Sequence, residues 1–138
     1  MDSIEFLNNT LVPVRLAAID KDGFPLICSL WFIHQDGELL CASHASAKII
    51  RVIKENPHCA FEVSTNAIPY KGVRGKAVAT LKSDAEGLVL SKLIARYLAS
   101  SQPKLSKWLL SRRKDEYAIH LKITSQSSWD FSSRMQGA

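Results

Sequence analysis

Two hydroxyl groups, a histidine and a lysine fall within six positions where a strand-like run gives way to a helical pattern. These residues are Ser43, His44, Ser46 and Lys48. A helix that begins here presents unpaired backbone amides and the positive end of its dipole, which together attract anions. A lysine in the first turn is unfavourable against that dipole unless an anion lies between them. The spacing therefore predicts a phosphate site at Ser46 and Lys48. On the alternative reading, Ser46 only caps the helix and Lys48 is only solvated.

The other residues capable of chemistry lack a supporting pattern. The three cysteines lie far apart in separate apolar runs, at Cys28, Cys41 and Cys59. Without a C-x-x-C pair they are expected to be reduced core residues, with no metal and no disulfide. Three histidines lie within expected strands and are interpreted as structural: His34, His58 and His120. No Ser-His-Asp or Cys-His arrangement has local support, so the catalytic residues remain unidentified.

Length and composition indicate one globular domain spanning residues 1–138. Apolar residues make up 46% of the chain, which is enough for a packed core. No apolar run reaches the roughly 18 residues needed to cross a bilayer. The acidic first residues lack the basic flank and apolar core of a secretory signal, so we expect a cytoplasmic protein.

The excess positive charge is concentrated in one segment. The net charge is +5, and residues 87–114 hold seven of the 18 Lys and Arg residues and no acid. This segment could meet an anion, a nucleic acid or a membrane surface. Its second half, 104–114, is amphipathic, and the reading we favour is that its apolar side packs on the barrel. We therefore expect neither a nucleic-acid nor a membrane partner.

Alternating apolar residues and turn signals predict a mainly β fold. Asp-Gly turns separate the first strands. The expected strands are 14–19, 25–34, 39–43, 58–64, 73–82, 117–124 and a short one at 127–131. The expected helices are 3–9, 46–55 with Ser46 as its cap, 84–98 opened by a capping box at 83–86, and 104–114. The pattern predicts a small barrel of six to seven antiparallel strands with helices on its outside.

Two strands carry further information. Strand 25–34 is apolar on both faces, so we expect it to be covered twice, once by the barrel interior and once by a helix, a ligand or a second subunit. Strand 73–82 has a face of small residues at Gly75, Ala77 and Ala79, which predicts a bulky neighbour. Trp31, Ile33 and this small-residue face would form a patch too large for a monomer to expose, which predicts a homodimer.

The order of these motifs resembles a known family. The resemblance runs through "RLAAIDKDGFPLICSLWFIHQDGELLCASHASAKIIRVIKENPHCAFEV", then "GVRGKAVA", and ends with "YAIHLKITSQSSWDF". The sequence is similar to the pyridoxamine 5′-phosphate oxidase-like family of FMN-binding split β-barrels. About residues 10–82 and 115–131 are covered, while residues 84–114 are not diagnostic.

The resemblance implies a homodimer with two FMN sites at the interface. It implies that the 5′-phosphate is held by Ser46 and Lys48, with Ser43 and His44 nearby. The isoalloxazine ring would lie beside Ile27, Cys28, Ser29 and Leu30, partly through backbone groups. Arg15 would reach the ring edge or the phosphate, with Lys71 and Arg74 as weaker candidates. The last implied residue is Trp129, contributed by the other subunit.

The sequence departs from true pyridoxamine phosphate oxidases. It lacks their more arginine-rich phosphate motif and their C-terminal substrate motif, so the resemblance implies flavin binding without fixing the reaction. We predict a flavoprotein oxidoreductase that uses FMN on an unidentified small molecule. Alternatives are a deazaflavin-dependent reductase, and a haem-binding split barrel with His44 or His120 as axial ligand. A third is a binding protein that uses the basic segment on nucleic acid or an anionic membrane.

Overall fold

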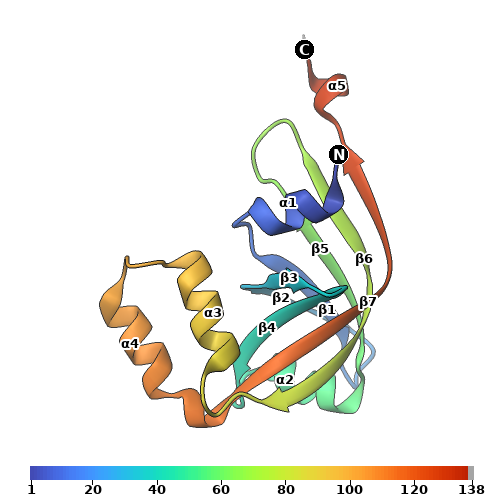
Figure 1. Cartoon of the computed structure of the whole chain (residues 1–138). Helices are drawn as coiled ribbons and strands as arrows, with labels where there is room; N and C mark the ends of the chain where they lie inside the picture. Colours follow the sequence, from blue (N-terminus) through green and yellow to red (C-terminus); the bar gives the residue numbers. More distant parts are fainter. Residues whose placement is uncertain (137–138) are drawn as a thin grey trace.

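The computed structural model describes residues 1–136, and its strands form one antiparallel sheet (Figure 1). The strands are β1 (Val14–Ile19), β2 (Pro25–Leu30), β3 (Ile33–Gln35), β4 (Glu38–His44), β5 (His58–Ser64), β6 (Lys71–Ser83) and β7 (Glu116–Asp130). The helices are α1 (Ser3–Asn9), α2 (Lys48–Glu55), α3 (Leu88–Tyr97), α4 (Pro103–Ser111), the 3-10 turn η1 (Arg113–Asp115) and α5 (Ser132–Met135). In this part of the chain, no helix is long and apolar enough to cross a bilayer.

The strand order confirms the predicted fold class. Neighbours in the sheet run β2-β1-β5-β6-β7-β4-β3, with β2 and β3 at its two ends. Because β3 follows β2 after only two residues, the sheet curls until its ends approach each other without closing (Figure 1). The result is a split barrel with the helices on its outside.

The alternating pattern of the strands builds the barrel core. On β1, for example, Val14, Leu16 and Ala18 are buried while the residues between them are not. Helix α2 contributes a broad apolar face to the same core: Ile49, Ile50, Val52 and Ile53. The small residues Ala77 and Ala79 also lie inside this core. They therefore do not form part of an exposed patch, which corrects the sequence-based interpretation of strand 73–82.

Two strands differ from their expected lengths. The single strand expected over 25–34 is interrupted at Trp31 and Phe32, where Phe32 turns fully into the core. Trp31 stacks on Tyr97 of α3, with ring centroids 5.2 Å apart. Trp31 is therefore covered within the chain and does not require a partner subunit. The two strands expected over 117–131 are instead one 15-residue strand, β7, paired with β6 along most of its length.

The helix starts also differ from the predicted caps. Helix α2 begins at Lys48 with Ala47 as its cap residue, and no side chain caps it. Ahead of α3, the carboxylate of Asp84 accepts hydrogen bonds from the amides of Val89 and Leu90. The capping box predicted at 83–86 is therefore wrong. The helix begins only at Leu88, and Asp84 bonds amides five and six residues after it.

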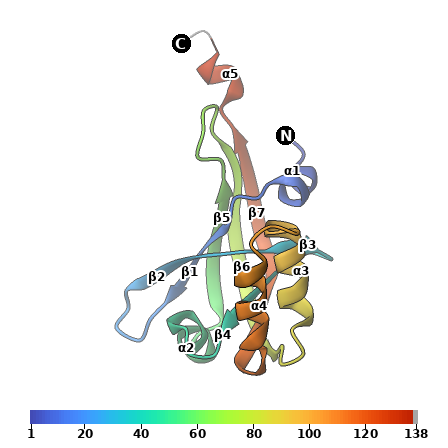
Figure 2. The ribbon, with the colours of Figure 1, turned by 90° about the vertical axis from the view of Figure 1, so that its left-hand side faces the viewer.

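Helices α3 and α4 form a layer beside the barrel (Figure 2). Helix α3 packs on β4 and buries Leu90, Leu93 and Ile94. Helix α4 contacts α3 and has no buried residue; Leu105 and Trp108 remain 39% and 53% exposed. The apolar side of segment 104–114 therefore faces α3 and a cavity, and not the barrel wall as expected.

The far ends of β5, β6 and β7 project beyond the barrel as an arm (Figures 1 and 2). Loop 65–70 and helix α5 lie at its tip, where the amide of Tyr70 approaches the sulfur of Met135 at 3.4 Å. Ile68 and Tyr70 are exposed there. The arm is thus an extension of the sheet that leaves apolar side chains in solvent.

Candidate functional site

The curled sheet opens between β2 and β4, and we call this opening the split. Within residues 1–136, β2 pairs with β1 alone, and β4 beyond Leu40 pairs with β7 alone. One edge of each strand consequently presents backbone N–H and C=O groups that no ladder uses. Unpaired edges are places where a ligand can make main-chain hydrogen bonds.

A cavity of about 380 Å³ lies at the split, and we call it the split cavity. Four of the sequence-predicted site residues line it: Ser29, Leu30, Ser43 and His44. The opposite wall comes from the helical layer and from the start of β7. The residues of that wall are Leu90, Leu93, Leu105, Leu109, Arg112 and Glu116. The cavity thus lies between β2, where the flavin ring is expected, and segment 90–116, which the sequence did not connect with the flavin.

The turn before α2 is held by His44 and Ser46. The Ser46 amide donates to Nδ1 of His44 at 3.2 Å, and the Ser46 hydroxyl lies 2.8 Å from the same nitrogen. Since Nδ1 accepts, the proton of neutral His44 is on Nε2, which points at Asp115 Oδ2, 3.9 Å away. Ser46 is therefore engaged with its own turn and does not cap the helix.

Lys48 already has a partner at the start of α2. Its Nζ lies 3.3 Å from Asp20 Oδ2, and Arg51 reaches the other Asp20 oxygen at 3.5 Å. The Lys21 amide is the largest cause that lowers the pKa of Asp20, and hydrogen bonds from Lys48 and Arg51 add to it. The unfavourable position of Lys48 at the helix start is thus compensated by an acid from the β1–β2 turn. The helix amides themselves lack a side-chain cap.

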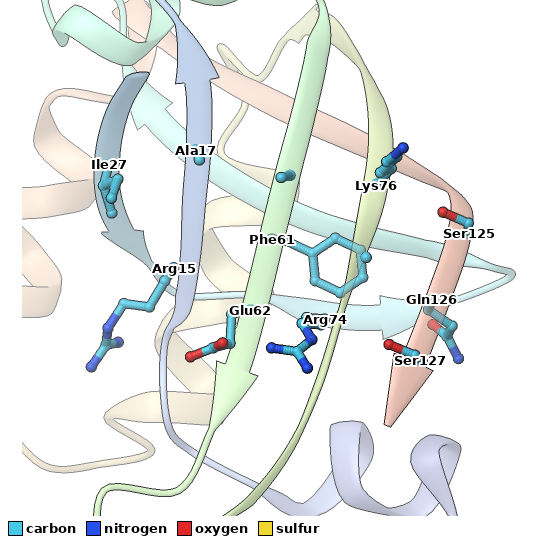
Figure 3. Close-up of a pocket in the computed structure, with 12 residues that line it drawn as sticks. Arg15, Ala17, Ile27, Phe61, Glu62, Arg74, Lys76, Ser125, Gln126 and Ser127 are labelled. Carbon is cyan, nitrogen blue, oxygen red and sulfur yellow. The ribbon is translucent and has the colours of Figure 1, made fainter. Parts of the chain in front are cut away.

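A second depression, the outer groove, lies on the outer face of the sheet (Figure 3). It has a volume of about 730 Å³. Arg15, Glu62, Arg74 and Ser127 form a cross-strand row from β1 to β7, so the charges alternate in sign. Ala17 and Ala60 also line the groove, and their small side chains account for its depth. Three predicted site residues line it: Arg15, Ile27 and Arg74.

Strand β2 is covered on one face only. Leu26, Cys28 and Leu30 pack on the core, and burial raises the pKa of the Cys28 thiol. On the outer face Ile27 is 67% exposed. The expectation that both faces are covered is therefore not met within one chain. Cys28 can serve a ligand at the split through its backbone, because its side chain faces the interior.

The remaining predicted residues lie on the arm. Lys71 is opposite Asp130, and Trp129 is opposite Gly72, on β6 and β7. The guanidinium of Arg74 lies 4.8 Å from the centre of the Trp129 ring. The structure therefore distributes the twelve predicted residues over the split, the turn before α2, the outer groove and the arm.

The residues at the split and at the turn before α2 that were not predicted include three charged ones: Asp20, Arg112 and Glu116. Glu116 is buried, and its pKa is raised by that burial and by Asp84, while Arg112 lowers it. The sequence held one signal for Glu116: it is an acid directly before the apolar run of β7, just after the acid-free segment 87–114. Among the described residues no cluster of three or more His, Cys, Asp or Glu side chains forms a metal site.

Comparison with known proteins identifies the fold. No family model matches the sequence, and no curated protein is significantly similar to it. Solved structures match well, and one of them is an F420 reductase, with 24% identity, a TM-score of 0.75, and coverage of 89% of this chain and 94% of that one.

Two other solved structures agree with this match. HutZ, a heme storage protein from Vibrio cholerae, has 17% identity and a TM-score of 0.70 over 92% of this chain and 91% of its own. A candidate pyridoxamine 5′-phosphate oxidase from Listeria innocua has 13% identity and a TM-score of 0.68 over 91% and 93%. The chain therefore has the split-barrel fold of pyridoxamine 5′-phosphate oxidase-like proteins. Identities at this level establish the fold alone.

Proposed function

We propose that this split-barrel chain is an FMN-binding oxidoreductase that works as a homodimer on a small molecule. The observation that carries the proposal is the convergence of three unsatisfied backbone surfaces. These are the free edge of β2, the free edge of β4 and the uncapped amides at the start of α2. A ligand with a flat polar ring and a phosphate complements such a set.

The turn before α2 fits the phosphate of FMN. The helix amides would donate to it, together with the ammonium of Lys48 and with the Ser46 hydroxyl, which would turn from His44 Nδ1 to the phosphate. Phosphate would take the place of Asp20 as the partner of Lys48 and Arg51. The Asp20 carboxylate therefore lies where we propose that the phosphate of FMN binds.

The outer face and free edge of β2 fit the ring. Ile27 offers an exposed apolar side chain, and the free edge of β2 around Ser29 and Leu30 offers backbone hydrogen-bonding groups at the split. FMN, when bound, supplies electron transfer to or from a second small molecule. The chain's own residues would bind and orient the ring and exclude water from it.

A second copy would complete this site. Phe24 and Ile27 are 72% and 67% exposed on the β1–β2 hairpin, which leaves an apolar surface beside the ring position. The arm projects from each protomer with Lys71 and Trp129 near its end (Figure 1). In the homodimer, Trp129 of the partner subunit would cover the ring. The exposed hairpin and the projecting arm support this arrangement.

A deazaflavin coenzyme is the second candidate. The observation in its favour is the outer groove, where Arg15, Arg74 and Lys76 supply three cations against the single carboxylate of Glu62. These cations would complement the acidic tail of a deazaflavin, for which FMN has no counterpart. The fold likeness to an F420 reductase supports the same candidate.

The test is a cofactor titration of the full chain. The protein as purified is examined for a flavin absorption spectrum, then stripped and titrated with FMN, with F420 and with haem. We expect saturable quenching of FMN fluorescence at one FMN per chain. Tight binding of F420 without FMN binding would favour the second candidate. A Soret band on haem titration that vanishes in His44→Ala or His120→Ala, without flavin binding, would overturn the proposal.

A further inference from the structure

The split cavity has an apolar wall that the proposed flavin position does not use. Four leucines of α3 and α4 form it, facing Leu30 and Trp31 across the split: Leu90, Leu93, Leu105 and Leu109. A volume of about 380 Å³ lies within the range of small-molecule sites. The cavity is therefore large enough for one small apolar molecule beside β2.

One end of the cavity is polar and carries a cation. Arg112 lies there with Glu116 and His44. Among residues 1–136 Arg112 makes no ion pair, and its guanidinium lies over the Trp108 ring at 4.6 Å. Glu116, which also lines the cavity, is buried, and that burial raises its pKa. Arg112 is thus a cation in the lining of an apolar cavity, and it makes no ion pair among residues 1–136.

We propose that the split cavity binds a substrate with an apolar ring body and a single carboxylate, which pairs with Arg112. This inference rests on the proposed function, because it assigns the molecule that would lie next to the flavin. A guanidinium matches a carboxylate through two parallel hydrogen bonds. A dianion such as a phosphate ester fits less well, because the cavity offers one arginine against two negative charges.

The test compares two probes of equal shape, 2-naphthoate and its neutral amide 2-naphthamide. Binding of each to the full chain is measured by calorimetry at pH 7, with and without saturating FMN. We expect the carboxylate to bind at least about tenfold more tightly than the amide. Arg112→Gln should lower naphthoate affinity by about tenfold and leave naphthamide affinity within about twofold. Arg112→Lys should keep part of the preference.

Arg113→Gln is the matched control, since Arg113 is the next residue and bonds the Leu110 carbonyl outside the cavity lining. It should leave both affinities unchanged. Leu109→Asn should weaken both probes, because it places a polar group in the apolar wall. Equal affinity for the two probes, or a preference that survives Arg112→Gln in folded protein, would overturn the inference.

The outcomes separate this inference from the proposed function. FMN binding without any carboxylate preference would refute the substrate class and keep the flavin site. Arg112-dependent naphthoate binding without FMN binding would keep the cavity assignment and refute the flavin proposal. Folding of each variant is checked by circular dichroism, so that a lost affinity is assigned to the site.

Discussion

At the scale of single residues, Lys48 has two competing partners: Asp20 of the same chain and the proposed phosphate. We expect Lys48→Ala to weaken FMN binding by roughly ten- to a hundredfold, because a charge-assisted contact is lost. Folding should be preserved, since Lys48 is largely exposed. Fluorescence titration measures the affinity, and Lys54→Ala at the other end of α2 is the control. Unchanged FMN affinity in Lys48→Ala would remove this residue from the site.

A substitution at Asp20 should have the opposite effect on FMN affinity. Asp20→Asn keeps an oxygen that accepts from the Lys21 amide and removes the charge that holds Lys48 and Arg51. We expect FMN to bind roughly two- to fivefold more tightly, because the anion no longer competes with an internal acid. Asp22→Asn in the same turn should have little effect. A weaker FMN affinity in Asp20→Asn would show that phosphate does not replace this carboxylate.

Glu116 links stability to pH. Because burial raises its pKa, the folded chain holds this proton more tightly than the unfolded chain does. Its contribution to stability is therefore full below the ordinary glutamate pKa and is lost as pH rises through the raised value. Glu116→Gln should stabilise the protein at pH 8 and make unfolding less dependent on pH between 5 and 8.

Urea unfolding at pH 5 and pH 8 measures this effect, with Glu86→Gln on the exposed surface as control. Asp20 and Asp130 have lowered pKa values and act in the opposite sense, at more acidic pH. They do not interfere above pH 5. A pH dependence that is identical in the natural chain and in Glu116→Gln would refute the assignment to this residue.

The sequence predicted some residues of the candidate site and not others. Ser43, His44, Ser46 and Lys48 lie together in the sequence and together in space, so local spacing located their turn. Arg112 and Glu116 line the split cavity together with Ser43 and His44, from a segment about 70 residues later. The sequence marked Glu116 only as an acid before an apolar run and did not connect either residue with the turn at 43–48, because their position depends on how α3 and α4 pack beside β4.

At the scale of elements, one side chain ties α1 to α3. The guanidinium of Arg96 donates to the carbonyls of Leu7 and Asn8 at 2.9 Å and of Thr10 at 2.6 Å. These are carbonyls at the end of α1, which have no partner within the helix. We expect Arg96→Ala to lower the free energy of unfolding by roughly 2–3 kcal/mol.

Chemical denaturation measures this change, and Lys92→Ala on the exposed side of the same helix is the control. Loss of the tie should also increase hydrogen exchange in α1 while the barrel strands remain protected. Equal unfolding midpoints for Arg96→Ala and Lys92→Ala would show that water satisfies the carbonyls equally well.

Element types were more predictable than their ends. Strands 14–19 and 58–64 match β1 and β5, because alternation and turn signals agree there. A break was expected at residues 125–126, between strands 117–124 and 127–131, yet β7 is continuous there because its neighbour β6 supplies the ladder. Likewise the break at Trp31 depends on stacking with Tyr97, a contact between distant residues. Tertiary pairing overrides local propensity at such positions.

At the scale of the molecule, the dimer proposal predicts a size of about twice the 15.3 kDa chain mass, with or without flavin. Trp129→Ala should weaken FMN binding by roughly tenfold or more while the dimer persists, because stacking area over the ring is lost. Light scattering gives the mass and fluorescence titration the affinity. Trp108→Ala, on the exposed side of α4, is the control.

A monomer that binds FMN at full strength would refute this interface. A dimer whose FMN affinity is unchanged in Trp129→Ala would keep the interface and remove the arm from the site. Trp129→Ala also bears on the outer groove, because Arg74, which lines that groove, lies over the Trp129 ring.

The pairing of β4 with β7 also sets the order in which the chain can fold during synthesis. Glu38 pairs with Lys122 and His44 with Glu116, so β4 leaves the ribosome long before its main partner exists. A nascent chain that stops before Glu116 contains every other strand, yet β4 has only the short β3 beside it. The sheet is therefore completed only after β7 has been synthesised, and chains truncated before Glu116 should be recognised by chaperones and proteases as unfinished.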